Sequence, residues 1–182
     1  GDEDRHFAYL EPKHQSHQKE LEGIATGHLG RLKAFLKPEF SEIPTPRQTF
    51  PVEASVVIPV RNRVHTIAEA VSSALSQKTE FPFNVLVIDN HSADGTTARL
   101  EEMAQQQPKL RHLVPVRCDL SIGGCWNEAL YSEYCGRFAV QLDSDDLYSS
   151  PDTLQLLVDL LRRGRFAMVI GSYTLVNAQL EE

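Results

Sequence analysis

Two short apolar runs, separated by a segment with helical spacing, constrain the fold of this chain more than any other feature. Residues 54–60 are rich in β-branched side chains, and residues 84–88 form a second, largely apolar run. Runs of this length are typical of strands that are buried on both faces of a parallel sheet. The sequence therefore predicts two buried strands with a helix between them. The apolar positions of that helix are Ile67, Ala70, Val71, Ala74 and Leu75.

The same alternation continues along the chain and predicts an α/β fold. Two helix starts carry a local signal: residues 66–69 read as a capping box, and Ser150-Pro151-Asp152 combine a cap, a proline in the first position and an acid in the first turn. Repeated β-α units favour a mostly parallel, Rossmann-like sheet covered by helices on both faces. The further elements expected are helices over 97–107, 122–134 and from 150 to Gly164, and strands over 110–116, 137–142 and 166–170.

The first fifty residues have a different character. Residues 14–37 are predicted to form a helix whose apolar stripe runs from Leu21 to Leu36, and four prolines between 38 and 51 then prevent its continuation. We therefore expect a helical extension with a Pro-rich linker over 1–51 and the sheet-containing domain over 52–182. The stripe is expected to pack against that domain or to contact a neighbouring domain.

Composition excludes several classes of protein. A net charge of −7 argues against a broad nucleic-acid surface, which needs a basic stripe. The chain contains no apolar segment long enough to span a bilayer and no basic, apolar start typical of a secretory signal. The three cysteines lack metal-ligand spacing, so reduced thiols in a cytoplasmic protein are the simplest account. Attachment to the inner face of the membrane stays open.

Three carboxylates stand where the strand expected at 137–142 ends. Asp143, Asp145 and Asp146 lie within four residues, and each close pair repels by about 1 kcal/mol in water and about 4 kcal/mol at an effective dielectric constant of 20. No Lys or Arg lies between Arg137 and Arg162, so another cation is expected. A hard divalent cation, Mg²⁺ or Mn²⁺, fits these oxygen ligands and also binds substrate phosphates. The alternative is a solvated Asp/Ser turn with a capping role.

Polar loops are expected to meet at one edge of the sheet. Right-handed crossovers place the loops after Val60, Ile88 and Leu142 on the same side. In open α/β sheets, ligands bind outside the carboxyl ends of the strands. A sheet built only for packing does not need polar groups gathered there, so this edge is the candidate binding site.

Three motifs on these loops resemble those of family 2 glycosyltransferases, which have the GT-A fold. Residues 56–62 resemble the first strand of that family. Residues 87–96 resemble its second-strand signature, an acidic pair followed by a Ser-x-Asp-Gly-Thr turn, and residues 141–146 resemble its DXD metal motif. The resemblance covers residues 54–177 and implies a metal-dependent, inverting transfer from a nucleotide-diphosphate sugar, with UDP-sugar favoured.

The resemblance also implies roles for individual residues. The loops after the first two strands would hold the base and ribose, and the DXD motif would hold the ribose and a divalent cation, Mn²⁺ or Mg²⁺, on the diphosphate. Asp145 is the first choice as a direct metal ligand, supported by Asp143 and Asp146. The nucleotide-binding residues expected on this basis are Pro59, Val60, Arg61, Asn62, Asp89, Asn90, Asn127, Asp143, Ser144 and Asp145.

The chain departs from the family pattern in three ways. Asn90 replaces the second acid of the acidic pair, which keeps a base contact feasible and leaves the base preference open. Asn127 matches, but Trp126 stands where the family often has Arg. The motif for the acceptor-binding half and its catalytic base is not found, so the base is unknown and we expect this chain to be a portion of a longer protein with further domains.

The resemblance implies a saccharide or lipid-linked acceptor, as in bacterial polysaccharide biosynthesis. Two alternatives stay open. A nucleotidyltransferase that makes the sugar nucleotide usually has a Gly-rich, basic loop after the first strand, whereas residues 59–63 contain no Gly. A non-catalytic nucleotide-binding or scaffold domain is the other alternative, and the intact acid cluster speaks against it.

Overall fold

The computed structural model describes residues 15–37, 39, 49–164 and 166–177 of the chain. By its internal contacts the chain divides into two units, Gly1–Ser41 and Glu42–Glu182. Helix α1 (Gln15–Arg31) belongs to the first unit, and all the strands described belong to the second. The domain boundary expected after residue 51 stays a prediction.

Helix α1 is shorter than the sequence predicted. A helix was expected over 14–37; residue 14 lies outside the described residues, and α1 ends at Arg31. Lys33 has a φ of 56°, and the amide of the residue after it donates to the carbonyl of Leu29 at 2.9 Å. A left-handed residue with this bond is a Schellman motif, which ends a helix. The stripe is exposed, with Leu36 at 88%, and its expected packing stays a prediction.

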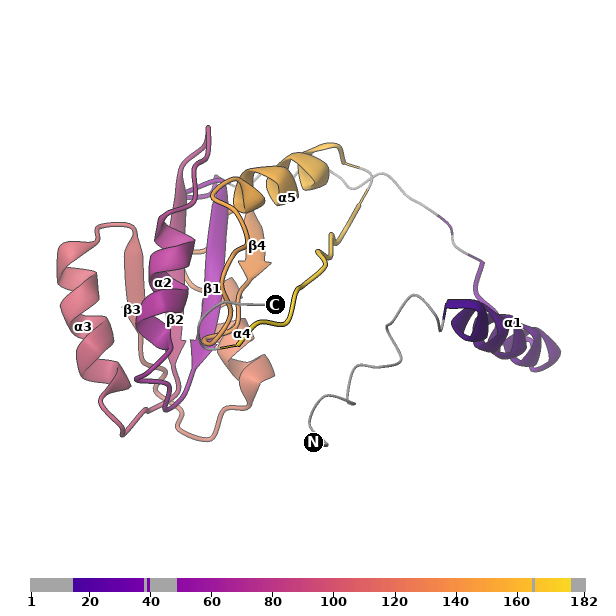
Figure 1. Cartoon of the computed structure of the whole chain (residues 1–182), viewed down its shortest axis with the longest axis horizontal. Coiled ribbons are helices and arrows are strands. Elements are labelled where there is room, and N and C mark those ends of the chain that lie inside the picture. The colour runs from indigo at the N-terminus through magenta and orange to yellow at the C-terminus, as the bar shows by residue number, and fades with distance from the viewer. Residues whose placement is uncertain (1–14, 38, 40–48, 165, 178–182) are drawn as a thin grey trace. The chain divides into compact units, whose positions relative to one another are not determined.

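The four strands form one parallel sheet in the order β3-β2-β1-β4 (Figure 1). β1 pairs with β2 along its whole length, and Val60 lies opposite Asp89. The chain therefore moves outward from β1 to β3 and then returns to the far side of β1, so its winding reverses between β1 and β4. The α/β prediction is confirmed. The strands are β1 (Ala54–Val60), β2 (Phe83–Asp89), β3 (Leu110–Leu113) and β4 (Phe138–Gln141).

Helices cover both faces of the sheet, as predicted. One face is covered by α2 (Ile67–Leu75), α3 (Thr96–Gln106) and α5 (Thr153–Arg162), and the other by α4 (Ile122–Leu130). Alternate residues of β1 serve the two layers, because Val56 and Ile58 pack in the larger core cluster and Val57 in the smaller. All of β1 and β2 is buried. Burial of each Val, Leu or Ile side chain in these two strands contributes about 1.5–3 kcal/mol to stability. β1 and β2 are therefore the rigid base of the domain.

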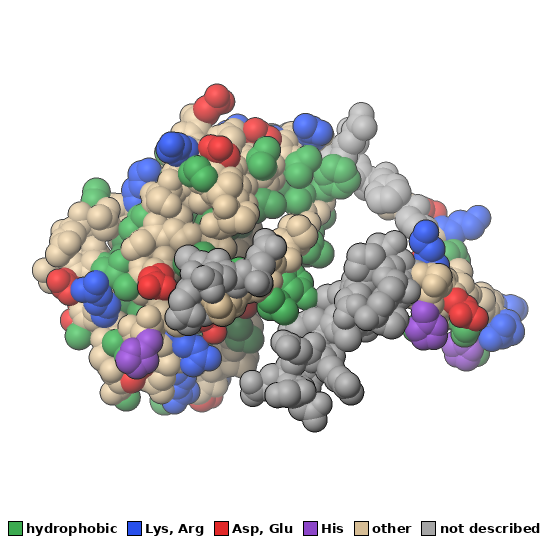
Figure 2. All heavy atoms as spheres, in the orientation of Figure 1, with side chains coloured by type: hydrophobic (Ala, Val, Ile, Leu, Met, Phe, Trp, Pro, Cys, Tyr) green, Lys and Arg blue, Asp and Glu red, His purple; other side chains and the backbone are tan. Residues whose placement is uncertain are grey.

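The surface of the second unit carries mixed charge. Figure 2 shows Lys and Arg side chains interspersed with Asp and Glu on the face in view, and apolar side chains gathered over α5. Leu156 of α5 is 63% exposed. Among the described residues, no helix combines the length and the apolar character needed to cross a bilayer.

The fifth strand expected over 166–170 is not formed. These residues carry no strand pairing, and Phe166, Met168 and Ile170 are 47%, 71% and 79% exposed. An apolar run becomes a strand only when a neighbouring strand supplies the ladder of hydrogen bonds, and β4 is left as the edge of the sheet. The third strand and the helix after it are also shorter than expected, ending at Leu113 and Leu130.

The capping box predicted at 66–69 is wrong. Thr66 does precede α2, but its side chain makes no capping hydrogen bond, and its buried Oγ1 has no hydrogen-bond partner within the described part of the chain. Its φ and ψ of −113° and −29° are helical. A capping hydroxyl reaches the helix amides from extended backbone, so this geometry turns the Thr66 side chain away from them.

Helix α5 begins at Thr153, after the proline that was expected in its first position. The cap predicted at Ser150 is present, because Ser150 Oγ accepts from the Asp152 amide at 3.1 Å. Gln77, which follows α2 and is 6% exposed, accepts from the Leu154 amide with Oε1 and donates to the Ser150 carbonyl with Nε2, each at 2.9 Å. A tertiary contact therefore adds to the local cap at this helix start.

Gly136 allows the segment after α4 to pass against β1. A Cβ atom on Gly136 would lie 2.9 Å from the backbone of Ala54, closer than real contacts allow. Its amide donates to Ser55 Oγ at 2.8 Å, and Ser55 Oγ donates to Asn84 Oδ1 at 2.6 Å. These satisfied buried groups join β1, β2 and the start of β4.

Candidate functional site

Three polar loops leave the carboxyl ends of β1, β2 and β4 at one edge of the sheet. The parallel registers place Val60 opposite Asp89 and Val57 opposite Gln141, so all three strands end on the same side. Open α/β sheets bind ligands where the winding reverses, which here is between β1 and β4. We call the set formed by Asp89, the last residue of β2, and the loop residues 61–66, 90–95 and 142–149 the rim.

Asp89 ends β2 and is fully buried. Its Oδ1 accepts from the Ser92 amide at 2.9 Å, and its Oδ2 accepts from Thr97 Oγ1 at 2.5 Å and lies 3.3 Å from His112 Nε2. Burial by itself would raise the pKa of Asp89, but these hydrogen bonds, that of His112 first, outweigh it and hold the pKa well below its ordinary value. The predicted nucleotide ligand Asp89 is thus an ionised anchor whose two oxygens both face protein donors.

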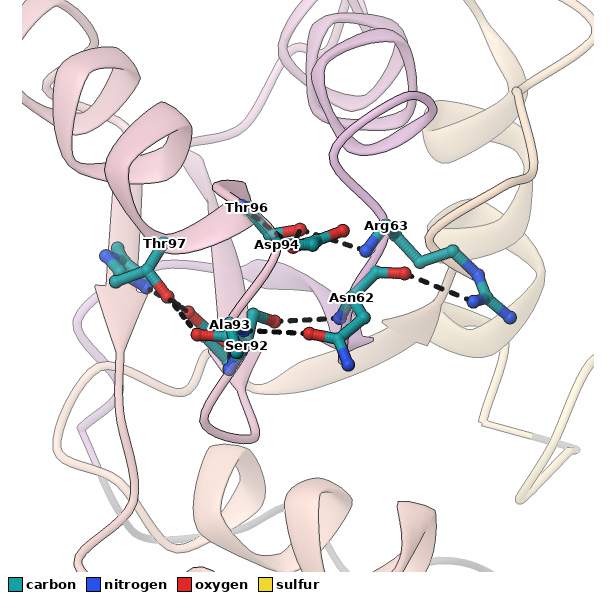
Figure 3. Close-up of polar contacts among 9 residues, drawn as sticks. Asn62, Arg63, Ser92, Ala93, Asp94, Thr96 and Thr97 are labelled. Carbon is teal, nitrogen blue, oxygen red and sulfur yellow. Dashed lines mark hydrogen bonds and ion pairs between the residues drawn. The ribbon is translucent and has the colours of Figure 1, made fainter.

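Asn62 fastens the first rim loop to the second (Figure 3). Its amide donates to Ser92 Oγ at 2.9 Å, and its Oδ1 accepts from the Ala93 amide at 2.8 Å. Asp94 adds a further link by accepting from the Val64 amide at 3.0 Å. The Asn62 side chain, predicted to contact the nucleotide, is therefore already used to hold the two loops together.

Left-handed backbone occurs in both of these loops. Asn62 and His91 each have a φ of 55°. Outside glycine this conformation costs on the order of 1–2 kcal/mol, and such strain gathers at functional sites. Hydrogen bonds to Ser92 and Ala93 hold Asn62 in this conformation. The Nε2 atom of His91 lies 3.2 Å from the carbonyl oxygen of Arg117. Gly95, with a φ of 103°, supplies the third left-handed position without that cost.

Asn90 differs from Asp89 in having a free acceptor. It is 6% exposed, and its Nδ2 donates to the carbonyl of Leu120 at 2.8 Å. That carbonyl fixes the orientation of the amide, because an Oδ1 in the same place would face another acceptor. Oδ1 of Asn90 is buried and has no hydrogen-bond partner among the described residues. An unpaired buried acceptor costs about 1–3 kcal/mol, and a ligand N–H would remove that cost.

The other residues predicted to bind nucleotide differ in exposure. Pro59 and Val60 are buried in β1, so only their backbone can reach a ligand. The carbonyl of Val60 accepts from the Asn90 amide at 2.9 Å. Arg61, on the first rim loop, and Asn127, on α4, are exposed, and their side chains have no hydrogen bond or ion pair with another described residue. Both side chains are therefore available to a ligand.

The acids after β4 do not form a closed cluster. Asp143 is half-buried and accepts from Gln141 Nε2 at 3.1 Å, Ser144 is buried, and Asp145 and Asp146 are exposed. Within the described ranges, no three His, Cys, Asp or Glu side chains are arranged to hold a metal ion. Burial raises the pKa of Asp146, and the charges of Asp143 and Asp145 raise it further. The three acids therefore repel one another, as their sequence spacing predicted.

The cation that faces these acids comes from the first rim loop. Arg63 Nε lies 3.7 Å from Asp145 Oδ2, and both side chains are about half exposed. Arg63 lies far in sequence from the interval between Arg137 and Arg162, so the absence of Lys and Arg from that interval did not point to it. The signal that could have found Arg63 is the topology. The crossovers that bring the loops after β1 and β4 to one edge of the sheet also bring Arg63 near the acids.

Two further residues that hold Asp89 were missed. Thr97 lies in the first turn of α3, and His112 lies in β3 with its side chain 7% exposed. No local pattern marks either of them. His112 lies opposite Val87 in the pairing of β2 with β3, so only the sheet register brings it near the end of β2.

Comparisons with known proteins find a matching family and similar folds. The family model described as Glycosyl transferase family 2 matches residues 55–181. The UDP-Glc:alpha-D-GlcNAc-diphosphoundecaprenol beta-1,3-glucosyltransferase WfgD of Escherichia coli is 30% identical over 124 residues, which cover 68% of this chain and 46% of that protein.

Solved structures are similar over the sheet-containing part. TarS 1-349 of S. aureus, in complex with UDP-GlcNAc, has a TM-score of 0.52 and 27% identity, covering 61% of this chain and 31% of its own. The mannosyltransferase PcManGT from Pyrobaculum calidifontis, in complex with GDP-Man and Mn²⁺, has a TM-score of 0.52 and 24% identity, covering 74% of this chain and 39% of its own. The chain spans less than half the length of each of these proteins.

Proposed function

The chain belongs to glycosyl transferase family 2 and has the GT-A fold, and on this premise we propose that its rim binds the nucleoside diphosphate of a sugar donor. The observation that carries the proposal is the free acceptor of Asn90. It is buried at the end of β2, beside the point where the winding of the sheet reverses. An apolar or purely structural edge would leave this oxygen unsatisfied, whereas a nucleobase can donate to it.

Asn90 also bears on which nucleobase the site accepts. Because one N–H of Nδ2 is donated to the Leu120 carbonyl, Oδ1 is the polar atom of the Asn90 side chain that has no partner among the described residues. We propose that Oδ1 of Asn90 faces the ring N–H of the base, which uracil has at N3 and guanine at N1. Cytosine N3 and adenine N1 are acceptors, and these two bases can donate only through their exocyclic amines. On this proposal UDP- and GDP-sugars suit the site. UDP-sugar is favoured, since UDP-Glc stands in the name of the E. coli relative and UDP-GlcNAc is bound in the TarS structure.

The acids after β4 suit a divalent cation on the diphosphate. Mg²⁺ and Mn²⁺ are usually held by one or two carboxylates together with substrate phosphates, so a closed protein cluster is not required. Asp145 would be the first ligand, with Asp143 and Asp146 in support. The bound cation would neutralise charge that develops on the departing diphosphate. Asp89 and Asn62 keep the first two loops in place, and Arg61 and Asn127 are available for polar contacts with the nucleotide.

We extend the proposal to the whole reaction. Transfer would invert the anomeric centre and would deliver the sugar to a saccharide or lipid-linked acceptor in bacterial polysaccharide assembly, in the cytoplasm. The E. coli relative supports this acceptor class, because its name specifies a diphosphoundecaprenol-linked sugar. The base that deprotonates the acceptor is not assigned to a residue.

The experiment is calorimetric titration with UDP, GDP and CDP, each in Mn²⁺ and in EDTA. UDP should bind at least tenfold more tightly than CDP, because at the ring position proposed to face Asn90 cytosine has an acceptor where uracil has an N–H. Asn90→Ala should remove that preference. Asp145→Asn should remove the gain from Mn²⁺, whereas Asp152→Asn, an exposed acid at the start of α5, should keep it.

Each arm of the experiment can fail on its own. Equal affinities for UDP and CDP would contradict the role given to Asn90. Equal binding with Mn²⁺ and with EDTA would contradict the metal site. Failure of UDP and GDP to bind under both conditions would contradict the donor site as a whole.

A further inference from the structure

Arg63 and Asp145 meet where the winding of the sheet reverses. Arg63 belongs to the rim loop after β1 and Asp145 to the rim loop after β4, with 3.7 Å between Nε and Oδ2. In the part of the chain that the structure describes, this is the only ion pair that joins two rim loops. The pair therefore spans the place where open α/β sheets bind their ligands.

The backbone of Arg63 is held from both sides. Its amide donates to Thr96 Oγ1 at 2.9 Å, and its neighbours Asn62 and Val64 are each hydrogen-bonded to the second rim loop. Figure 3 shows the Arg63 side chain extending away from these contacts, with Nη1 donating to the Asn62 carbonyl at 3.3 Å. The guanidinium is thus presented to the acids from a fixed backbone.

The side chains of Arg63 and Asp145 are both exposed enough to leave this ion pair and bind a ligand instead. Arg63 is 51% and Asp145 is 53% exposed, and their separation of 3.7 Å is longer than in a tight charge-assisted hydrogen bond, at about 2.7–2.9 Å. An exposed pair of this kind shifts an equilibrium constant by at most about fivefold. A divalent cation for Asp145, or a diphosphate for Arg63, carries more charge than the present partner.

We infer that Arg63 is a positioning residue that exchanges Asp145 for the donor diphosphate. Without ligands, its guanidinium holds Asp145 and competes with a divalent cation for that carboxylate. When the donor is loaded, Asp145 turns to the cation, and Arg63 turns to the phosphate oxygens, for which its planar fork of donors is suited. The inference rests on the proposed donor site and describes how that site passes from empty to loaded.

The exchange predicts effects of opposite sign from one substitution. Arg63→Gln removes the competitor of the cation, so the Kd for Mn²⁺ alone should fall about three- to fivefold. The same substitution removes a phosphate ligand, so the Kd for UDP in EDTA should rise about fivefold or more. A merely structural role would weaken both ligands, because a disturbed rim would bind neither well.

The experiment measures Mn²⁺ alone by the electron paramagnetic resonance of the free ion, and UDP in EDTA by calorimetry. Arg162→Gln is the matched control, since it removes the same charge and an ion pair with Glu53 at 3.0 Å, before the start of β1 and so at the opposite edge of the sheet. It should leave both constants unchanged. In an Asp145→Asn background, Arg63→Gln should no longer tighten Mn²⁺, because the pair is already lost.

The outcomes separate this inference from the proposed function. If the wild type binds UDP but Arg63→Gln changes neither constant, or weakens both, the exchange is overturned and the donor site stands. If the wild type binds no Mn²⁺ alone, the exchange is overturned because no competition exists. If the wild type binds UDP neither with Mn²⁺ nor with EDTA, the proposed donor site itself is overturned.

Discussion

Replacing Asp89 by Asn should destabilise the protein more than any other single charge change at the rim. The carboxylate is fully buried and receives three hydrogen bonds. Hydrogen bonds to a charged group contribute about 1.5–3 kcal/mol each. Asn keeps the shape and one neutral acceptor, which can take the place of Oδ2 and still accept from Thr97 and His112, while the Ser92 amide loses its partner. Because a bond to a neutral acceptor is about half as strong as one to a charge, the loss equals about two of the three charged bonds. At the lower end of that range, the free energy of unfolding should fall by about 3 kcal/mol at pH 7.

Urea unfolding followed by tryptophan fluorescence measures this difference. Trp126 is the only tryptophan and packs against the smaller core cluster, so its emission reports on unfolding of the sheet. Asp152→Asn is the matched control, because it makes the same chemical change at an exposed position whose side chain forms no capping bond. Its free energy of unfolding should fall by less than about 1 kcal/mol, the most that an exposed acid contributes at a helix N-terminus.

The pH dependence gives a second, independent readout. The pKa of Asp89 is lowered from its ordinary value of 3.8, so its contribution is present above that value and is lost as the pH falls through the folded-state pKa. Near pH 3 the difference between wild type and Asp89→Asn should be about 1.2 kcal/mol smaller than at pH 7. A difference under about 1 kcal/mol at pH 7, or one that does not narrow, would refute the reasoning.

Three further substitutions or reactions test the packing that supports the rim. Gly136→Ala should lower the free energy of unfolding by about 1–3 kcal/mol, because its Cβ would press on β1. Gly123→Ala should not destabilise the protein, because its Cβ would meet only Ser121 Oγ, at an ordinary contact distance of 3.9 Å. Equal unfolding midpoints for the two variants would contradict the close approach at Gly136. Gln77→Ala should lower the free energy of unfolding by about 1–2 kcal/mol, because it removes the acceptor of the Leu154 amide at the start of α5. Gln105→Ala, at an exposed position of α3, should leave the free energy of unfolding unchanged, and the same urea titration measures both. Cys118 is exposed, and burial raises the pKa of the other two thiols, so a thiol reagent at about pH 8 should label one site quickly; rapid labelling of all three would contradict this.

The pattern of apolar residues along the chain was sufficient to predict much of the fold. The buried runs at 54–60 and 84–88 predicted β1 and β2, and the alternation with helices predicted the parallel sheet and the edge that carries the rim. The prediction succeeded because a strand that is buried on both faces has apolar side chains at consecutive positions, a pattern that is visible in the sequence. The same pattern at 166–170 did not produce a strand, since strand formation also requires a partner ladder that local sequence does not specify.

The roles of the polar residues were decided by the tertiary structure. In sequence, Asp89 and Asn90 are two adjacent polar residues with equal claims to a ligand. In the fold, His112 and Thr97 close off Asp89, while Asn90 keeps a free oxygen. Likewise, the sequence by itself determined that three acids lie together after β4, and only the reversal of winding beside β1 placed Arg63 against them. Hydrogen bonds and ion pairs act over a few ångströms, so partners far apart in sequence are chosen by strand register and crossover.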